Sequence, residues 1–220
     1  MPTRRTPDTP DLRQRILDTS RALLDAEGVA ALSLREVARR AGVTHQAPYH
    51  HFADREAILA ELVTEGFQRL ADRLAKPNDN AARDGRHATL VASGEAYVGY
   101  ALDHPGVFRI MFRPDLCDQA RFPAAVAAGA RGHGELLRLV HLLHGAAASP
   151  ALASLYWAQV HGLACLLIDG PLGQALPTRR ARLAHVRETM ARFADATVGQ
   201  DPTRSQPLSS PAESRSSKGE

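Results

Sequence analysis

The pattern of hydrophobic and polar positions predicts a chain built from helices. In the first predicted helix, residues 11–27, large apolar residues recur at helical spacing: Leu12, Ile16, Leu23 and Leu24. We expect Asp11 to cap this helix and Gly28 to end it. No segment alternates apolar and polar residues for long enough to predict a strand. The sequence therefore predicts an all-α fold.

A second stretch, SLREVARRAGVTHQAPYHHF at residues 33–52, predicts two short helices joined by a tight turn. Ser33 and Glu36 have the spacing of a capping box, in which each side chain bonds the other residue's backbone N–H. One apolar face follows at helical spacing: Leu34, Val37, Ala38 and Ala41. Gly42 then ends the helix, and Thr44 is positioned to cap a second one.

The second predicted helix, which reaches about His51, is polar. Its candidate DNA contacts are His45, Gln46, Tyr49 and His50, whose side chains can donate and accept hydrogen bonds to bases and phosphates. Two short helices joined by a glycine-containing turn form a helix-turn-helix, whose second helix can enter a DNA major groove. An ordinary pair of packed helices would show the same spacing, but the polar second helix favours DNA binding.

The rest of the chain divides into further helices and two polar ends. We expect helices over residues 54–76, 81–104, 105–113, 123–144, 149–168 and 178–198. We expect the first of them to end at the run from Pro77 to Asn80, and the one over 123–144 to be interrupted or loosened by glycines. This predicts a disordered arm (1–10), an N-terminal three-helix helix-turn-helix domain (11–53), a linking helix (54–76), a larger helical C-terminal domain (81–198) and a disordered tail (199–220).

The helix at about 150–169 is apolar on most sides, which indicates burial on several faces. Together with the helix at 178–198 it has the composition to form a four-helix bundle with a second copy of the chain. The sequence therefore predicts a homodimer.

Composition adds few constraints to this picture. The chain has 220 residues, 44% of them hydrophobic, and a net charge of +3, which permits nucleic-acid binding without requiring it. Cys117 and Cys165 form no metal-binding motif. We find no signal peptide and no apolar run of membrane-spanning length, so we expect a cytoplasmic protein that binds no membrane and no cofactor.

Two alternatives remain open at this point. An enzyme is suggested by five histidines in the C-terminal half: His104, His133, His141, His144 and His161. No carboxylate or cysteine completes a metal set around them, and the GARGHG run follows no strand, so surface histidines and a structural His161 are the simpler interpretation. The other alternative is a DNA binder without a ligand, which would lack a cavity.

The residues from about Arg13 to Leu62 resemble the TetR family of bacterial transcriptional regulators. The resemblance rests on the RQRILDTSRALLDAEG helix, the glycine-valine turn, a Tyr-x-x-Phe ending, and ADREAIL after it. In the C-terminal half, WAQVHGL and His104-Pro105-x-x-Phe108-Arg109 resemble a C-terminal subtype marked by Trp-His-Gly. The family implies an all-helical homodimer that binds a palindromic operator as a repressor and is released by a small molecule.

The resemblance also implies roles for particular residues. It implies DNA contacts from eight positions: Ser33, Arg35, Thr44, His45, Gln46, Tyr49, His50 and Arg55. A mostly apolar effector pocket would be lined by Tyr97, Tyr100, Phe108, Met111, Phe112, Trp157 and His161, although such residues at helical spacing are also typical of a core. Pro48 departs from the family pattern, which has a leucine or isoleucine there, and its ring would crowd the Thr44 carbonyl.

Overall fold

The computed structural model describes residues 11–198, and within this range it contains helices and no strand. The predicted arm (1–10) and tail (199–220) lie outside the described residues. The helices are α1 (Leu12–Glu27), α2 (Leu34–Ala41), α3 (Arg55–Asp79), α4 (Ala81–Asp84), α5 (Arg86–Asp103), α6 (Pro105–Met111), α7 (Pro123–His144), α8 (Pro150–Ile168), α9 (Pro171–Ala175) and α10 (Arg179–Thr197). Short 3-10 turns are η1 (Val29–Ala31), η2 (Ala47–His50), η3 (Gln119–Arg121) and η4 (Gly145–Ala147). The all-α prediction is confirmed.

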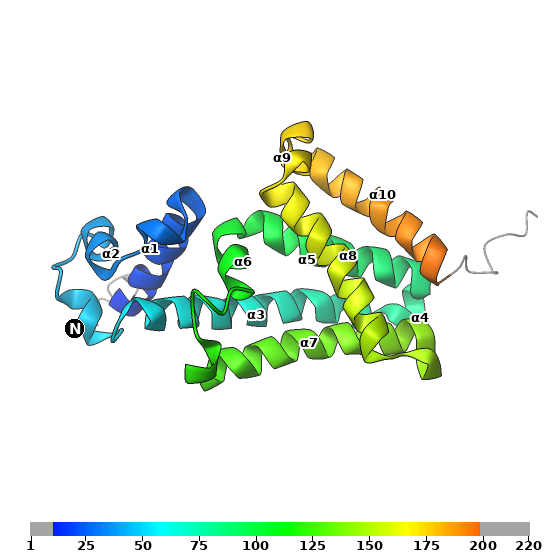
Figure 1. Ribbon diagram of the computed structural model, residues 1–220, viewed down its shortest axis with the longest axis horizontal. Helices are drawn as coiled ribbons and strands as arrows, with labels where there is room; N and C mark the ends of the chain where they lie inside the picture. The colour runs from blue at the N-terminus through cyan, green and yellow to red at the C-terminus, as the bar shows by residue number, and fades with distance from the viewer. Residues whose placement is uncertain (1–10, 199–220) are drawn as a thin grey trace, which may run out of the picture.

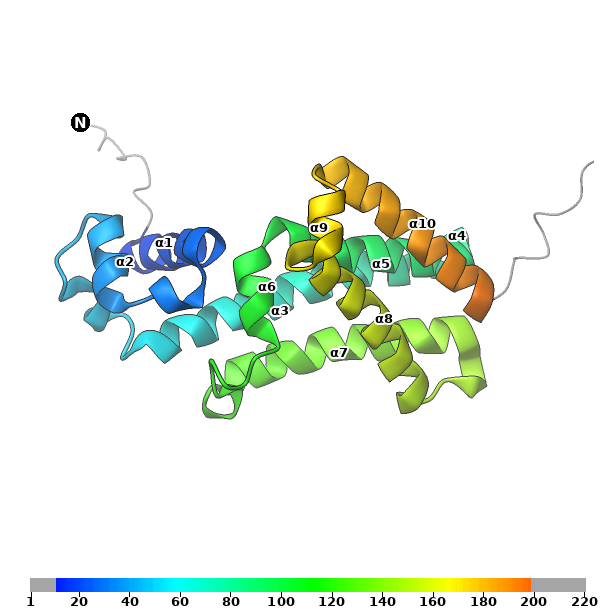
Figure 2. The same ribbon diagram turned by 45° about the horizontal axis from the view of Figure 1, so that its top comes forward.

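The long helix α3 joins two unequal parts of the molecule (Figure 1). α1 and α2 lie around its first turns, and the remaining helices surround the rest of it. α3 and α7 lie side by side and run in the same direction, with ion pairs between Asp72 and Arg131 at 2.5 Å and between Asp79 and Arg138 at 2.6 Å. Figure 2 shows α8 crossing α7, while α10 packs against α5. Because α3 belongs to both parts, the domain boundaries stay a prediction.

The prediction that α3 ends before Pro77 is wrong, since the helix continues through this proline to Asp79. A proline inside a helix removes one backbone hydrogen bond, and its ring crowds the carbonyl four residues earlier, here that of Arg73. Here contacts with α7 offset that loss: Asn78 Nδ2 donates to the Glu135 carbonyl at 3.0 Å and to Glu135 Oε2 at 2.8 Å. The next predicted helix, 81–104, is interrupted at Gly85, whose φ of 80° separates α4 from α5.

The glycines of α7 do not interrupt it, contrary to our prediction. The helix is continuous from Pro123 to His144. A Cβ atom built on Gly129 or Gly132 would lie 3.7–3.8 Å from the ring of Phe67 on α3. The small residues therefore allow α7 to pack closely against α3.

Helix α8 carries more apolar surface than one protomer buries. Leu155 is 64% exposed, Leu166 45% and Trp157 39%. By length and composition alone α8 would suffice to cross a membrane, which corrects our statement that no run has that character. A single such helix is also typical of soluble proteins with a partner on that face.

Candidate DNA interface and ligand cavity

The helix-turn-helix is held by a continuous apolar core. α2 buries Leu34, Val37, Ala38 and Ala41 as predicted. α1 buries Ile16, Leu23 and Leu24 as predicted, but Leu17 is buried and the predicted Leu12 is only half-buried. Gly28 ends α1 with a φ of 77°, and Gly42 ends α2 in the left-handed conformation, with a φ of 66°. Arg15 adds a bond from α1 to the Ala41 carbonyl. Buried apolar contacts and the Arg15 hydrogen bond therefore fix the position of α2.

The predicted caps are only partly correct. The Ser33 hydroxyl accepts from the Glu36 backbone N–H at 3.2 Å, whereas Asp11 makes no side-chain cap. The reciprocal half of the capping box is wrong, because the Glu36 carboxylate accepts from Arg39 at 2.7 Å and from Arg40 at 2.6 Å instead. These hydrogen bonds lower the pKa of Glu36 to about 2. Two of the three arginines on α2 are thus paired within the helix.

The predicted second helix of the motif is a 3-10 turn. Only Ala47–His50 are helical, and Gln46 precedes them without a side-chain cap, so Thr44 does not act as the cap. The reason is Pro48, which has no N–H to donate to Thr44. The Ala47 N–H donates to the Thr44 carbonyl at 3.0 Å, and the Tyr49 N–H donates to the Gln46 carbonyl at 3.1 Å. Each bond joins residues three positions apart, which is the spacing of a 3-10 helix. Pro48 itself is buried, where the family pattern has an aliphatic residue.

This turn presents most of the predicted DNA-contacting residues on one exposed segment. Thr44, His45, Gln46, Tyr49 and His50 are exposed, and Tyr49 is 55% exposed. Ser33 and Arg35 are also exposed, at the start of α2. His51 is exposed on the same segment and was not among the predicted contacts, although its place beside His50 was a signal.

Arg55 differs from the other predicted DNA contacts. Its guanidinium is half-buried and donates to the Leu32 carbonyl at 2.8 Å and to the Val29 carbonyl at 2.7 Å. These bonds hold the η1 turn against the start of α3. The side chain therefore has a structural role that sequence reasoning did not foresee.

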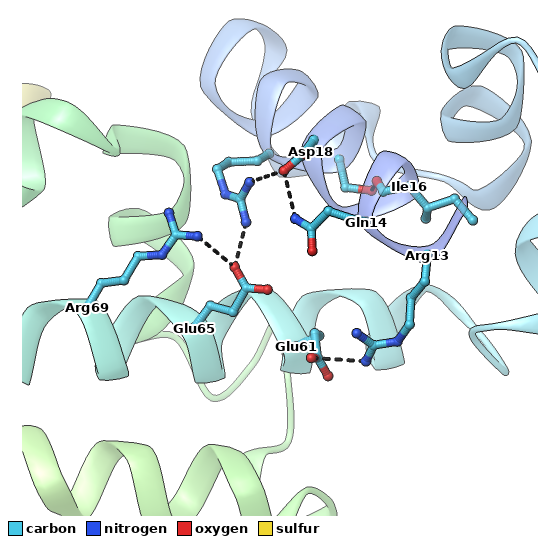
Figure 3. A network of polar contacts seen from close by, with 9 residues as sticks. Arg13, Gln14, Ile16, Asp18, Glu61, Glu65 and Arg69 are labelled. Atoms are coloured by element: carbon cyan, nitrogen blue, oxygen red, sulfur yellow. Dashed lines mark hydrogen bonds and ion pairs between the residues drawn. The ribbon is translucent and has the colours of Figure 1, made fainter. Parts of the chain in front are cut away.

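A polar network attaches α1 to α3 (Figure 3). Arg21 on α1 donates to Asp18 and Glu65, both at 2.6 Å, and Arg69 on α3 reaches the same Glu65 oxygen at 3.2 Å. Arg21 has only 16% of its side chain exposed, so this pair is less screened than a surface ion pair. α1 is thereby fixed to the same helix that continues into the larger part of the molecule.

α1 also contacts α6, across the two parts of the molecule. The Gly106 N–H at the start of α6 donates to Asp25 Oδ1 at 2.7 Å. A Cβ on Gly106 would lie 2.5 Å from the Leu24 carbonyl carbon and 2.6 Å from the Asp25 nitrogen. Only glycine allows this approach of the two backbones.

The larger part encloses a cavity of about 610 Å³. This lies within the range of roughly 300–1,000 Å³ typical of small-molecule sites. Four predicted pocket residues line it: Tyr97, Met111, Phe112 and Trp157. The other three, Tyr100, Phe108 and His161, are not in its wall, which corrects the prediction. Lining residues missed from the sequence include Phe67, Asn78, Ser93 and Tyr156, which carried no distinguishing pattern.

Three of the lining residues, Tyr97, Phe112 and Trp157, form an aromatic cluster with Phe108 and His161 behind them. The Tyr97 hydroxyl lies 2.9 Å from His161 Nδ1 and accepts from Trp157 Nε1 at 3.2 Å. The His161 ring packs against Phe108 and Phe112, with centroids 5.4 Å and 4.8 Å away. Burial raises the pKa of Tyr97 and lowers the pKa of His161. His161 therefore packs in this cluster as a neutral ring, whereas the surface location expected for the other histidines is wrong for His104 and His144, which are half-buried.

Two other histidines of the enzyme interpretation are also placed by the structure. His144 Nε2 lies 2.7 Å from the Tyr156 hydroxyl, and the His104 ring lies 5.0 Å from the Tyr100 ring. Burial lowers the pKa of both histidines. Within residues 11–198, no three histidine, cysteine or carboxylate side chains lie close enough to hold a metal ion.

These lowered histidine pKa values predict that acid destabilises the fold. The unfolded chain binds protons with a histidine pKa of about 6.5, and the folded chain binds them only at lower pH. Between the two values the unfolded state holds more protons, so the free energy of unfolding falls as pH falls from 7.5 to 5.5. Urea unfolding at the two pH values measures this. We expect the free energy of unfolding to fall less between these pH values in His161→Gln than in the wild type. His141→Gln, at an exposed histidine, is the control. An equal fall in all three proteins would contradict the prediction.

Comparison with known proteins agrees with this architecture. Residues 16–62 match the family described as bacterial regulatory proteins, tetR family, and residues 90–193 match a tetracyclin repressor-like C-terminal domain. The HTH-type transcriptional regulator Rv1816 of Mycobacterium tuberculosis is 27% identical over 101 residues, 46% of this chain and 43% of that protein. The chain thus spans less than half the length of the curated relatives it matches.

Solved structures extend the likeness over most of the chain. A protein with unknown function from Rhodococcus sp. RHA1 is 29% identical with a TM-score of 0.68, and the match covers 86% of this chain and 98% of that one. The TetR family transcriptional regulator PfmR from Thermus thermophilus shares the fold at 19% identity with a TM-score of 0.62, over 84% of this chain and 97% of that one. The fold and the two matched domains define a helix-turn-helix protein with a tetracyclin repressor-like C-terminal domain. The chain belongs to the TetR family.

Proposed function

We propose that the protein is a cytoplasmic repressor that binds a palindromic operator as a homodimer and is released by a small molecule. The observation that carries DNA binding is the exposed polar turn at residues 44–51, mounted on a buried three-helix frame. Gln46 and His45 supply base contacts, and Tyr49, His50, Ser33 and Arg35 supply phosphate contacts. Arg55 donates hydrogen bonds to the Leu32 and Val29 carbonyls and so stabilises the three-helix frame. Only its remaining N–H groups are available to contact phosphate.

The outward face of α8 supports the proposal that a second copy of the chain binds there. Its exposed residues fall at helical spacing and are small or apolar: Ala151, Ser154, Leu155, Ala158, Cys165 and Leu166. Small residues allow close approach of two helices, and the leucines supply apolar area. In the proposed dimer this face and α10 form the interface. The turns at residues 44–51 of the two protomers then bind half-sites about 34–36 Å apart.

Release by a ligand is supported by the position of α6. Met111 at its end and Phe112 after it line the cavity, while Gly106 at its start contacts Asp25 of α1. A ligand that displaces Met111 or Phe112 moves one end of a seven-residue helix whose other end holds α1. DNA and ligand then oppose each other with equal coupling free energy, about 1–3 kcal/mol in typical cases.

Selection of bound fragments from a random DNA pool tests the proposed function. We expect recovery of an inverted repeat, because a two-fold dimer presents the same turn twice. Recovery of unrelated sequences with no common repeat would contradict the proposal.

A variant of the turn then tests the assignment of base contacts. Gln46→Ala should weaken binding to the selected sequence about tenfold or more, since a bidentate amide–adenine contact discriminates by roughly 1–3 kcal/mol. Its affinity for unrelated DNA should not change. The matched control is Gln174→Ala, an exposed glutamine on α9. Equal losses on all DNA sequences would show that Gln46 contacts phosphate and not a base.

A further inference from the structure

The wall of the cavity is apolar over most of its length and polar toward one end. Phe67, Leu70, Leu74 and Asn78 line it on successive turns of α3. α5 follows α3 after the short α4 and runs back along it (Figure 1), and Ser93, in the first half of α5, also lines the cavity. Among these residues Phe67 lies nearest the start of α3, whereas Asn78 and its partner Glu135 lie at its last turn.

Two oxygens at the polar end have no hydrogen-bond partner among the described residues: Asn78 Oδ1 and Ser93 Oγ. Asn78 is only 3% exposed and Ser93 only 4%. The other buried serine and threonine hydroxyls, on Ser20, Thr64 and Thr89, each donate to the carbonyl four residues earlier at 2.7–2.8 Å. Ser93 is helical as well and does not make this bond. Buried polar groups are normally satisfied, so these two oxygens point to a ligand that satisfies them.

The hydrogen-bond network fixes which atom of the Asn78 amide is available. Its Nδ2 lies between two acceptors of Glu135, the backbone carbonyl and the carboxylate. An amide turned the other way would place two acceptors against each other. The free atom is therefore the oxygen, which accepts a hydrogen bond and cannot donate one.

We propose that Asn78 Oδ1 and Ser93 Oγ form a polar subsite for the effector, an uncharged, largely aromatic molecule with a hydroxyl group at one end. A hydroxyl can donate to Asn78 Oδ1 and accept from the Ser93 hydroxyl. The carboxylate of Glu135, which also lines this end, disfavours an anion there. The aromatic part fits beside Phe67, Phe112 and Trp157. This inference rests on the proposed role of the cavity as the effector site.

Calorimetric titration of the full chain with three probes of one shape tests the subsite. The probes are 4-hydroxybiphenyl, 4-methoxybiphenyl, which cannot donate, and biphenyl-4-carboxylate, which is charged at pH 7. We expect 4-hydroxybiphenyl to bind about tenfold more tightly than either of the others, the effect of one buried hydrogen bond.

Ser93→Ala distinguishes a binding role from a structural one. The variant should lose most of the preference for 4-hydroxybiphenyl, yet its melting temperature should equal or exceed that of the wild type. Removing an unsatisfied buried hydroxyl relieves the folded state of a desolvation cost. The matched control is Ser20→Ala on α1, whose buried hydroxyl donates to the Ile16 carbonyl at 2.7 Å outside the cavity wall.

Each contrary result has its own meaning. Equal binding of the hydroxyl and methoxy probes overturns the subsite and leaves the cavity as an effector site, with water satisfying the two oxygens. Tighter binding of the carboxylate overturns the assignment of an uncharged ligand. Failure of all three probes to bind overturns the subsite together with the effector role of the cavity, while selection of DNA tests the DNA-binding role separately.

Discussion

Gly106→Ala should lower the free energy of unfolding by about 1–3 kcal/mol, the usual cost of inserting an atom into a filled space. The added Cβ would lie 2.5 Å from the Leu24 carbonyl carbon and 2.6 Å from the Asp25 nitrogen, and backbone cannot turn aside as a flexible side chain can. The Asp25–Gly106 hydrogen bond of 2.7 Å would be displaced with it. Urea unfolding of the full chain measures the loss.

The same substitution at Gly134 is the matched control. Gly134 also lies inside a helix, α7, but a Cβ there meets nothing within 4 Å. Gly134→Ala should therefore stabilise the protein by about 0.5–1 kcal/mol, because alanine restricts the unfolded chain and favours the helix. If the two variants shift stability by similar amounts, the contact between α1 and α6 is looser than its distances imply.

Leu166→Glu should convert the proposed dimer to a monomer of 23.8 kDa. Leu166 is 45% exposed on the α8 face assigned to the interface. In a two-fold interface each substitution occurs twice, so two carboxylates would be desolvated on the same apolar surface. We expect the dimer dissociation constant to rise at least about 100-fold, since burying one unpaired charge typically costs 3–5 kcal/mol. Sedimentation equilibrium gives the mass directly.

Val126→Glu provides the comparison for this experiment. Val126 is 50% exposed on α7, outside the two helices of the proposed interface. This variant should remain dimeric and retain affinity for the selected DNA, while Leu166→Glu should lose affinity for the inverted repeat because each monomer contacts one half-site. Two dimeric variants would place the interface elsewhere on the surface.

The sequence predicted the frame of the helix-turn-helix because that information is local. Leu34, Val37 and Ala38 share a face at helical spacing, and Gly42 has a conformation that favours glycine. The path of α3 through Pro77 was not predictable in this way. It depends on the bonds between Asn78 and Glu135, which are 57 residues apart in the sequence.

The residues that line the cavity were predicted only in part. Aromatic residues could be assigned to helices, but which of them face a cavity depends on how each helix is rotated against its neighbours. Phe108 and Tyr100 turn into the core, whereas Phe67, on the linking helix, lines the cavity. The unsatisfied oxygen of Ser93 had no sequence signal at all, because a serine inside a helix usually bonds its own backbone.

Pro48 has a consequence for how readily this regulator could acquire a new target sequence. The turn at residues 47–50 is held by the fixed backbone angle of Pro48 and by burial of its ring. The side chain of its exposed neighbour Gln46 makes no cap bond to the turn and lies 3.2 Å from Nε2 of His45, the other proposed base contact. Under the proposed function these positions can be exchanged during evolution without a penalty in helix propensity. Pro48, which departs from the family pattern, thus determines how the turn folds, whereas its exposed neighbours determine which DNA sequence is bound.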